Sequence, residues 1–492
     1  MLLKFGPWTP DLPERDNPGL VVAKNALPLA TGYSSVNGTS VYGSALSAQC
    51  LGAISGKDIS DNTYNFAGDA TKLYQLGSAA WADVSVGGGY STASGGQWEF
   101  TVFGNRIVAT NYDNVPQSFV MGTSSAFANL GGSPPNAKHI ATVRNFVVLG
   151  DTNDGVGGHV NNRIWWSGLN NAETWTASQS TQAGSQDLAS GGKVKAIIGG
   201  EYGSVFMENS LYRMTYVGAP LIWQFDEIEG ARGTTSAKSC VKNGNLVAYA
   251  GIDGFYMWDG SQSIPIGNKQ INSFFFQDID PNYVDRVIGV YDPYRELIFW
   301  SYVSLELGGT NNNRLIVFNR SRDSATRWTI IDESLETLFL ALSEGYNVDN
   351  AAGTGYNVDT SPYGPDSPFW VGKRQFIAGF NTDHKMVTFD GSPKTAIFET
   401  GDFDLSGAGR RVQVEKVRPA VEGTDAVISI KLGYKNIQDE DVSYTDSVSP
   451  NTEGFCNFRT NARFHRAQTT ISGGFDCAYG VEPIATQSRG LR

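Results

Sequence analysis

Residues 98–110 read WEFTVFGNRIVAT, and this stretch decides the fold class of the chain. Two apolar runs of strand length flank Gly104 and Asn105, and these two residue types accept the backbone angles of a tight turn. The stretch therefore predicts a β-hairpin. Three further stretches repeat the pattern around other turns: HIATVRNFVVL at 139–149, SCVKNGNLVAYA at 239–250 and VIGVYDPYRELIFWSY at 287–302.

Each hairpin is followed by a second one with an aromatic run, often closed by a tryptophan, as Trp165 and Trp166 lead to Trp175. Two hairpins make a four-stranded antiparallel sheet, which buries both faces only when it packs in a ring of such sheets. The units recur at roughly the spacing of propeller blades, about 40 to 55 residues. We expect an all-β propeller of about seven blades, within a range of six to eight. The expected blade starts are Cys50, Trp98, Lys138, Lys193, Ala237, Val284 and Glu336.

The expected propeller spans residues 48–403 and lies between two other segments. Residues 1–47 are so rich in Pro and Gly that we expect an extended N-terminal arm, which joins the platform. Residues 404–492 contain separate strand-like runs and are expected to form a C-terminal β platform domain. The alternative architecture is a pair of β-sandwiches, which the even spacing of the units disfavours.

Composition and charge exclude several classes of protein. The formal net charge of −12 argues against a protein that grips nucleic acid over its whole surface, but it allows DNA to slide through a passage without sticking. No apolar stretch is long enough to cross a bilayer, and the first residues lack a signal-peptide pattern, so we expect no membrane anchor. The four cysteines lack zinc spacing and are expected to be reduced, although Cys456 and Cys477 are close enough in sequence to pair.

No catalytic, cofactor-binding or metal-binding residues are legible, and we expect no enzyme. The four histidines are scattered along the chain, and neither a GxSxG nor an HExxH pattern occurs. Residues 321–328 approximate the Asp-box turn of sialidase propellers, with Ala325 in place of a glycine. Such a box stabilises a turn, so it speaks for a propeller hairpin rather than for cleavage of a polysaccharide.

Two groups of residues are candidates for contacts. The arm carries aromatic and apolar side chains that would be poorly buried if it were free, so we expect it to lie on a neighbouring surface of this chain or of a partner. Basic residues of the C-terminal region either form a solvated or subunit-contact face or contact DNA. The interface candidates are Phe5, Trp8, Arg15, Leu20, Tyr33, Arg463, Arg466 and Arg489.

The stretch 344–369 is too long and too rich in Gly and Pro for a hairpin turn. It is interpreted either as a protruding contact loop or as a disordered insertion. Its aromatic residues Tyr346, Tyr356 and Tyr363 motivate an alternative function, a receptor- or glycan-binding propeller of the tail spike or fibre type.

The two ends of the chain carry a resemblance. The opening, with Phe5-Gly6-Pro7-Trp8, Asp11-Leu12-Pro13 and Asn17-Pro18-Gly19-Leu20, resembles the start of virion proteins of short-tailed bacteriophages. The closing Arg463-Phe464-His465-Arg466 and Ala478-Tyr479-Gly480-Val481 resembles the β-domain that ends many phage tail components. In its general layout the chain is similar to the tail nozzle, or tail hub and packaged-DNA stabilisation, proteins of podoviruses.

The resemblance implies a structural protein of the virion tail, assembled in the cytoplasm of the host bacterium. Its copies would form a ring, a homohexamer, below the portal and an adaptor or head-tail connector protein. Tail fibres, a spike or a needle would attach below. The ring would extend the channel, help to retain packaged DNA and conduct double-stranded DNA during ejection. The resemblance brings no cofactor and no catalytic residue.

Overall fold

The hairpin that decides the fold class forms as predicted. β10 (Glu99–Phe103) and β11 (Arg106–Thr110) pair antiparallel, with Phe103 opposite Arg106, so the turn has two residues. Gly104 has a φ of 58°, which glycine adopts without strain. The apolar side chains of β11 are buried in two different hydrophobic clusters, one on each face of the sheet.

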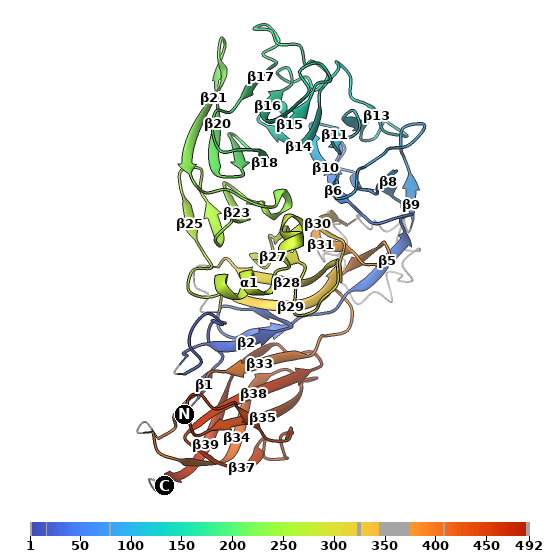
Figure 1. Cartoon of the computed structure of the whole chain (residues 1–492). Coiled ribbons are helices and arrows are strands. Elements are labelled where there is room, and N and C mark those ends of the chain that lie inside the picture. The colour runs from blue at the N-terminus through green and yellow to red at the C-terminus, as the bar shows by residue number, and fades with distance from the viewer. Residues whose placement is uncertain are drawn as a thin grey trace.

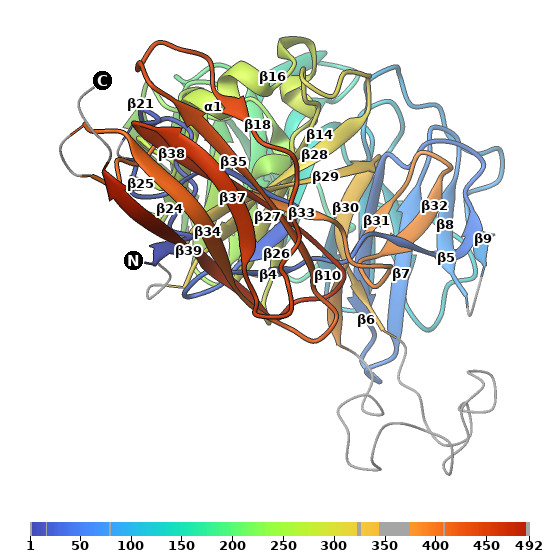
Figure 2. The same ribbon diagram turned by 90° about the horizontal axis from the view of Figure 1, so that it is seen from below.

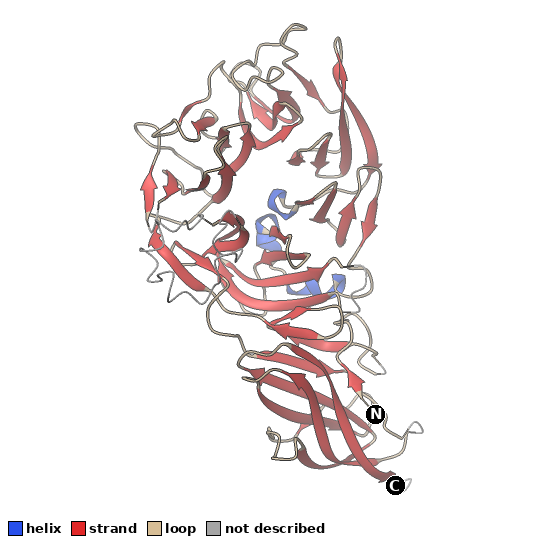
Figure 3. Cartoon of the chain, turned by 180° about the vertical axis from the view of Figure 1, so that it is seen from behind, coloured by secondary structure: helices blue, strands red, loops and turns tan. Residues whose placement is uncertain are grey.

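Seven such sheets form a closed ring, and a separate end domain extends from its rim (Figure 1). This is a computed structural model, and it describes residues 2–15, 17–77, 80–321, 326–343, 374–406 and 409–488. Strands dominate the fold, as Figure 3 shows. The helices are the short α1 (Asn272–Asp278), η1 (Ala237–Ser239) and η2 (Pro281–Arg286). None of the helices in the described ranges is long and apolar enough to cross a membrane.

The first four blades follow one another along the chain. The first is β6 (Gly52–Lys57), β7 (Thr63–Gly68), β8 (Leu73–Leu76) and β9 (Trp81–Asp83). The second adds β12 (Gln117–Val120) and β13 (Ala128–Asn129) to the hairpin above. The third is β14 (Asn136–Val143), β15 (Phe146–Asn153), β16 (His159–Trp166) and β17 (Gly184–Asp187). The fourth is β18 (Val194–Ile198), β19 (Gly203–Met207), β20 (Ser210–Gly218) and β21 (Ile222–Gly230).

Three further blades complete the ring. The fifth is β22 (Val241–Asn243), β23 (Leu246–Ala250), β24 (Phe255–Trp258) and β25 (Ser263–Pro265). The sixth is β26 (Ile288–Asp292), β27 (Leu297–Tyr302), β28 (Asn312–Asn319) and β29 (Trp328–Leu335). The seventh is β30 (Thr337–Leu342), β31 (Gln375–Phe380), β32 (Lys385–Thr388) and β5 (Ser40–Ala45). The predicted propeller is confirmed, and every first strand begins within a few residues of its expected start.

The N-terminal segment closes the ring, which corrects the prediction that all of residues 1–47 join the platform. β5 is the outermost strand of the seventh blade and pairs antiparallel with β32, where Val41 lies opposite Val387. The first strands of the seventh and first blades, β30 and β6, are also in contact. A strand from one end of the propeller sequence therefore completes a sheet from the other end, so the ring is not left with an open edge at the seam.

The end domain is a sandwich of two sheets built from both ends of the chain. One sheet has the order β3-β4-β39-β34-β37, with β1 also paired to β39. The other contains β2, β33, β38, β35 and β36. The strands are β1 (Leu3–Lys4), β2 (Leu20–Lys24), β3 (Ala26–Pro28), β4 (Tyr33–Ser35), β33 (Ala396–Thr400), β34 (Val412–Glu422), β35 (Val427–Lys435), β36 (Ser443–Tyr444), β37 (Cys456–Ala462), β38 (Phe464–Ser472) and β39 (Cys477–Ser488).

The boundary between the two parts also differs from the prediction. β33 lies within residues 48–403, yet it pairs with β38 over Ala396↔Ile471 to Glu399↔Gln468 and so belongs to the end domain. Both termini lie in this domain, and Figure 2 shows its strands at one side of the ring when the molecule is seen from below.

Candidate functional site: the junction of propeller and end domain

A single continuous sheet connects the propeller to the end domain. The strand order β26-β27-β28-β29-β2-β33-β38-β35-β36 runs from the sixth blade into the end domain without a break. β2, from the N-terminal arm, is the connecting strand. It pairs parallel with β29 at Lys24↔Ile330 and antiparallel with β33 from Leu20↔Thr400 to Lys24↔Ile397. The two parts are therefore hydrogen-bonded through β2, a strand of the N-terminal arm.

Aromatic residues of the arm fill the core beneath this sheet. Trp8 is 1% exposed, donates its indole N–H to the carbonyl of Val21 at 3.1 Å and meets Phe274 edge to face at 4.9 Å. Phe5 stacks on Phe398 of β33 at 5.0 Å. Burial of large aromatic side chains removes much apolar area from water, so these residues of the arm stabilise the junction.

Four of the predicted interface residues are therefore core residues of this chain. Phe5, Trp8, Leu20 and Tyr33 all lie in one hydrophobic cluster that also holds residues of the fifth and sixth blades and of the end domain. Tyr33 donates its hydroxyl to the carbonyl of Gly6 at 3.0 Å. Sequence reasoning left open whether the arm lies on this chain or on a partner, and its apolar side chains lie on this chain.

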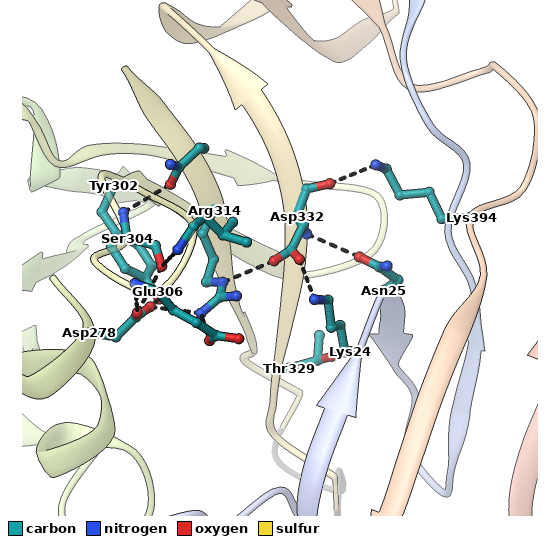
Figure 4. Close-up of polar contacts among 12 residues, drawn as sticks. Lys24, Asn25, Asp278, Tyr302, Ser304, Glu306, Arg314, Thr329, Asp332 and Lys394 are labelled. Carbon is teal, nitrogen blue, oxygen red and sulfur yellow. Dashed lines mark hydrogen bonds and ion pairs between the residues drawn. The ribbon is translucent and has the colours of Figure 1, made fainter. Parts of the chain in front are cut away.

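A fully buried arginine lies where the sixth blade meets the arm (Figure 4). Arg314 of β28 has 0% side-chain exposure, and its Nη1 donates to Asp278 at 2.9 Å and to Glu306 at 2.8 Å. Its Nε donates to Oδ1 of Asp332 on β29 at 2.9 Å. These carboxylates offset the cost of burying the charge, while the Nη2 atom of Arg314 has no hydrogen-bond partner among the described residues.

Asp332 also contacts the arm and the segment just before β33. Its second carboxylate oxygen pairs with Lys24 of β2, and its backbone N–H donates to the side chain of Asn25 at 3.0 Å. Lys394, just before β33, donates to the backbone carbonyl of Asp332 at 2.6 Å. One aspartate thus connects the sixth blade to two segments of the end domain.

The carboxylate of Asp278 stays ionised despite its burial. Desolvation alone would raise its pKa, but hydrogen bonds from Ser304 at 2.7 Å and Tyr302 at 2.8 Å, together with the charge of Arg314, hold the pKa below its usual value. Burial raises the pKa of Tyr302, so its hydroxyl remains a donor to Asp278. The group is an ion cluster in which Arg314 and Lys24 face the carboxylates of Asp278, Glu306 and Asp332.

A second buried arginine fixes the arm to the end domain. Arg466 of β38 is 5% exposed and donates to Asp402 at 2.7 Å and to Glu399 at 3.1 Å. It also pairs with Glu14 of the arm, and this hydrogen bond is the main cause that lowers the pKa of Glu14. Lys435 contributes a further ion pair to Asp402 at 2.6 Å. Arg466, predicted as an interface residue, therefore holds together segments of its own chain.

Two predicted residues come together on the outside of the end domain. Arg15 is exposed, its guanidinium lies over the ring of Phe464 at 5.2 Å, and it donates to Gln438 at 3.2 Å. Arg463, the neighbour of Phe464, is also exposed. Ile437, beside Gln438, is 66% exposed. We call these four residues, Arg15, Ile437, Gln438 and Arg463, the Arg15 surface.

The remaining predicted site residues lie outside the described ranges. They are Arg489, the candidate contact-loop residues Tyr346, Tyr356 and Tyr363, and Ala325 of the partial Asp box. The four cysteines are free thiols, including Cys456 and Cys477. Among the described residues, no group of three or more His, Cys, Asp or Glu side chains is placed to hold a metal ion.

Comparisons with known proteins concern the fold alone. No known family model matches the chain, and no curated protein sequence matches it. Similar solved structures include BBS1N in complex with ARL6DN, at 11% identity and a TM-score of 0.37, with 74% of this chain and 97% of that chain covered. The mitotic checkpoint complex aligns at 10% identity and a TM-score of 0.39, over 71% of this chain and 93% of that chain.

Sequence reasoning missed the acidic partners of both buried arginines. Glu14 and Arg466 are 452 positions apart, and no local pattern connects them. Arg314 carries one indication, since it is a charged residue at the start of the apolar run LIVF in a central strand. A charge at such a position predicts a buried ion pair, although it does not name the partner.

Proposed function

We propose that the chain is a structural ring component of the tail of a short-tailed phage, of the nozzle or hub type. The observation that carries the proposal is the junction, in which both chain ends form one end domain that is hydrogen-bonded into the sixth blade. The resemblance of the two ends to tail proteins gives the class. In this proposal the end domain builds the ring and the propeller projects from it as rigid bulk.

The charge of the chain is unevenly distributed. From Leu405 onward the chain has 11 basic and 10 acidic side chains, so the excess of acid in the net charge of −12 lies in residues 1–404. A near-neutral end domain would not grip DNA as a strongly basic wall would. Partners in this proposal are other copies of the chain, an adaptor above, fibres or a spike below, and double-stranded DNA in transit. No catalytic step is part of it.

The Arg15 surface is the contact that we propose between copies. It combines two guanidinium groups with Ile437, an apolar side chain left largely in water, and such combinations are typical of interfaces. An acidic neighbour would suit its two positive charges. Phe5, Trp8, Leu20 and Tyr33 are core residues, Arg466 is held in a buried ion cluster, and Arg489 lies outside the described residues.

Location in the particle tests the proposal directly. Antibodies raised against the propeller should label the tail end of purified virions, and peptides of the chain should be found in them by mass spectrometry. Disruption of the gene should give filled heads that lose their DNA or lack tails. A chain absent from particles, or particles that are complete and infectious without it, would contradict the proposal.

Receptor or glycan binding is the second candidate function, and one observation favours it. A hollow of about 640 Å³ lies beside the sixth and seventh blades and is lined by Tyr294, Phe376 and Phe389 together with Arg295 and Arg374. A hollow lined by aromatic side chains together with polar groups is suited to binding sugar rings. A glycan array tests this candidate: binding that is lost in an Arg374→Ala variant would support it, and no signal with the wild-type chain would remove it.

A further inference from the structure

One sheet of the end domain has an open edge on each of its two sides. Its strand order is β3-β4-β39-β34-β37, so β37 is the last strand on one side. On the other side, β39 pairs with β4 at Ala478 and with β1 at Gly480 and Val481. Further along β39, no described strand pairs with that side of it. From Pro483 onward the sheet therefore has only three strands, β39, β34 and β37.

The backbone along both edges is available to a further strand. Within the described ranges, no backbone hydrogen bond joins β37, or β39 after Pro483, to any strand except β34. Such an edge is a template for pairing with another chain, unless proline, charge or a bulge blocks it. β37 has no proline, and its side chains alternate regularly between buried and exposed. Pro483 removes one N–H from the other edge, which leaves residues 484–488 to pair.

Exposed apolar side chains accompany the open edge of β39. Tyr479 and Ile484 are exposed on this strand, and the exposed side chain of Leu2 lies against Gly480. On β37 the exposed side chains are polar, and they include Arg459, whose aliphatic stem can cover an apolar neighbour. An unpaired backbone and exposed apolar side chains at one place favour a partner that covers both.

The direction of the strands favours a second copy of the chain as that partner. β37 and β39 both run antiparallel to β34, so they run in the same direction as each other. A second copy placed beside the first without being turned over brings its β39 alongside β37 as a parallel strand. Each copy then uses β37 towards one neighbour and β39 towards the other. Head-to-tail contacts of this kind close into rings, whereas a two-fold contact between two β37 edges would leave both β39 edges open.

We propose that the end of β39 from a second copy pairs with β37, so that this sheet continues from one copy to the next. The inference rests on the proposed ring, and it goes further by naming the two strands that join the copies. Arg463 of the Arg15 surface follows β37 directly in sequence, so the paired edges and that surface would belong to one contact.

Disulfide cross-linking of the purified full chain tests the pairing. Arg459→Cys and Ile484→Cys place thiols at exposed positions on the two edges. The positions lie at nearly the same level of the sheet, because Lys416 pairs with Ile484 on one side and with Asn457 on the other. Neighbouring strands are about 5 Å apart, which is within reach of a disulfide.

The pattern of cross-links identifies the contact. Neither single variant should cross-link to itself after mild oxidation, since each contact then carries one new thiol. Co-expression of the two variants in equal amounts should cross-link roughly a quarter of the contacts, because both neighbours must carry the correct thiol. A variant with both substitutions should give a ladder of covalent oligomers that ends at the copy number of the ring.

The matched control is Lys431→Cys, an exposed position of β35 on the other sheet, which should not cross-link to Ile484→Cys. The wild-type chain, with its four free thiols, gives the background. The proposal is overturned if the double variant shows no cross-link above this background, or if a single variant cross-links to itself, which would indicate a two-fold contact. Rings of the double variant without cross-links would overturn the pairing alone, whereas absence of the chain from virions would overturn only its role in the tail.

Discussion

At the residue scale, the junction depends on two buried arginines whose partners come from distant parts of the chain. Arg314 binds three carboxylates of the sixth blade and its neighbourhood, and Arg466 binds carboxylates of the arm and of β33 and its continuation. Removal of such a cation leaves like charges close together and out of water, which costs more than the pair contributes when complete.

Replacement of Arg314 by alanine should destabilise the chain strongly. The substitution removes the cationic partner of the Asp278 carboxylate and of Oδ1 of Asp332. We therefore expect a loss of about 3 to 5 kcal/mol in the free energy of unfolding. The control is Arg418→Ala, which removes an exposed ion pair to Glu482 at 4.0 Å and should cost less than about 1 kcal/mol. Equal denaturation midpoints for the two variants would contradict the role given to Arg314.

His465 should make stability depend on pH in the acidic range. Its side chain is 0% exposed, neither ring nitrogen has a hydrogen-bond partner among the described residues, and burial lowers its pKa from 6.5 to about 4. Between these pH values the unfolded state binds a proton that the folded state does not. Stability should therefore fall as the pH falls from 6.5 to 4, by about 3 kcal/mol from this group.

A His465→Leu variant should lose that part of the pH dependence. Denaturation midpoints measured at pH 7 and pH 4.5 should differ less in this variant than in the wild type. The same pH dependence in the wild type and in His465→Leu would show that other groups cause it.

At the element scale, strands that form local hairpins were predictable and strands that pair at long range were not. Residues 98–110 contain both the strand pattern and the turn, so β10 and β11 follow from neighbouring residues. β5, β2 and β33 each find their partners across most of the chain, and alternation of apolar residues says nothing about which edge a strand joins. The arm was therefore predicted as extended, and the division of its strands among three sheets was not predicted.

The connecting strand β2 should be essential to the fold of the end domain. Ala23 is 0% exposed between β29 and β33, and an Ala23→Asp substitution would bury an unpaired charge there, at a cost of several kcal/mol. We expect limited proteolysis to cut the end domain of this variant before the propeller. Ala82→Asp, at an exposed position of β9, is the matched control and should be cut like the wild type.

Removal of the first 30 residues should unfold the end domain as well as prevent assembly. It removes β1, β2 and β3, together with Glu14 of the Arg466 cluster, so we expect the end domain of the isolated chain to unfold. Near-ultraviolet circular dichroism of the trimmed chain identical to that of the full chain would contradict it.

At the scale of the whole molecule, the blade count and the all-β class were accessible from sequence because each blade repeats one short pattern. The junction was not, since Lys24, Asp332 and Lys394 meet only through the tertiary fold. Of the predicted interface residues, Arg15 and Arg463 remain on the surface, while the apolar ones turned out to be core. Apolar residues in a Pro-rich arm indicate burial without saying in which subunit.

The Arg15 surface should govern assembly without affecting the fold. Ile437→Asp places an acidic group next to two exposed arginines and removes the apolar contact, so we expect fewer assembled copies at the same concentration. Ile59→Asp, at a position 89% exposed in the first blade, is the control and should assemble normally. If the Ile437→Asp variant assembles like the wild type, the Arg15 surface is not the contact between copies.

The mass of the full chain in solution tests the central claim most directly. Native mass spectrometry, with electron microscopy of the same sample, should show a closed ring whose mass is a whole multiple of 53.1 kDa, with propellers at its periphery. The resemblance to nozzle proteins predicts six copies. A chain that stays monomeric at high concentration, alone and in extracts that contain its particle, would contradict the account.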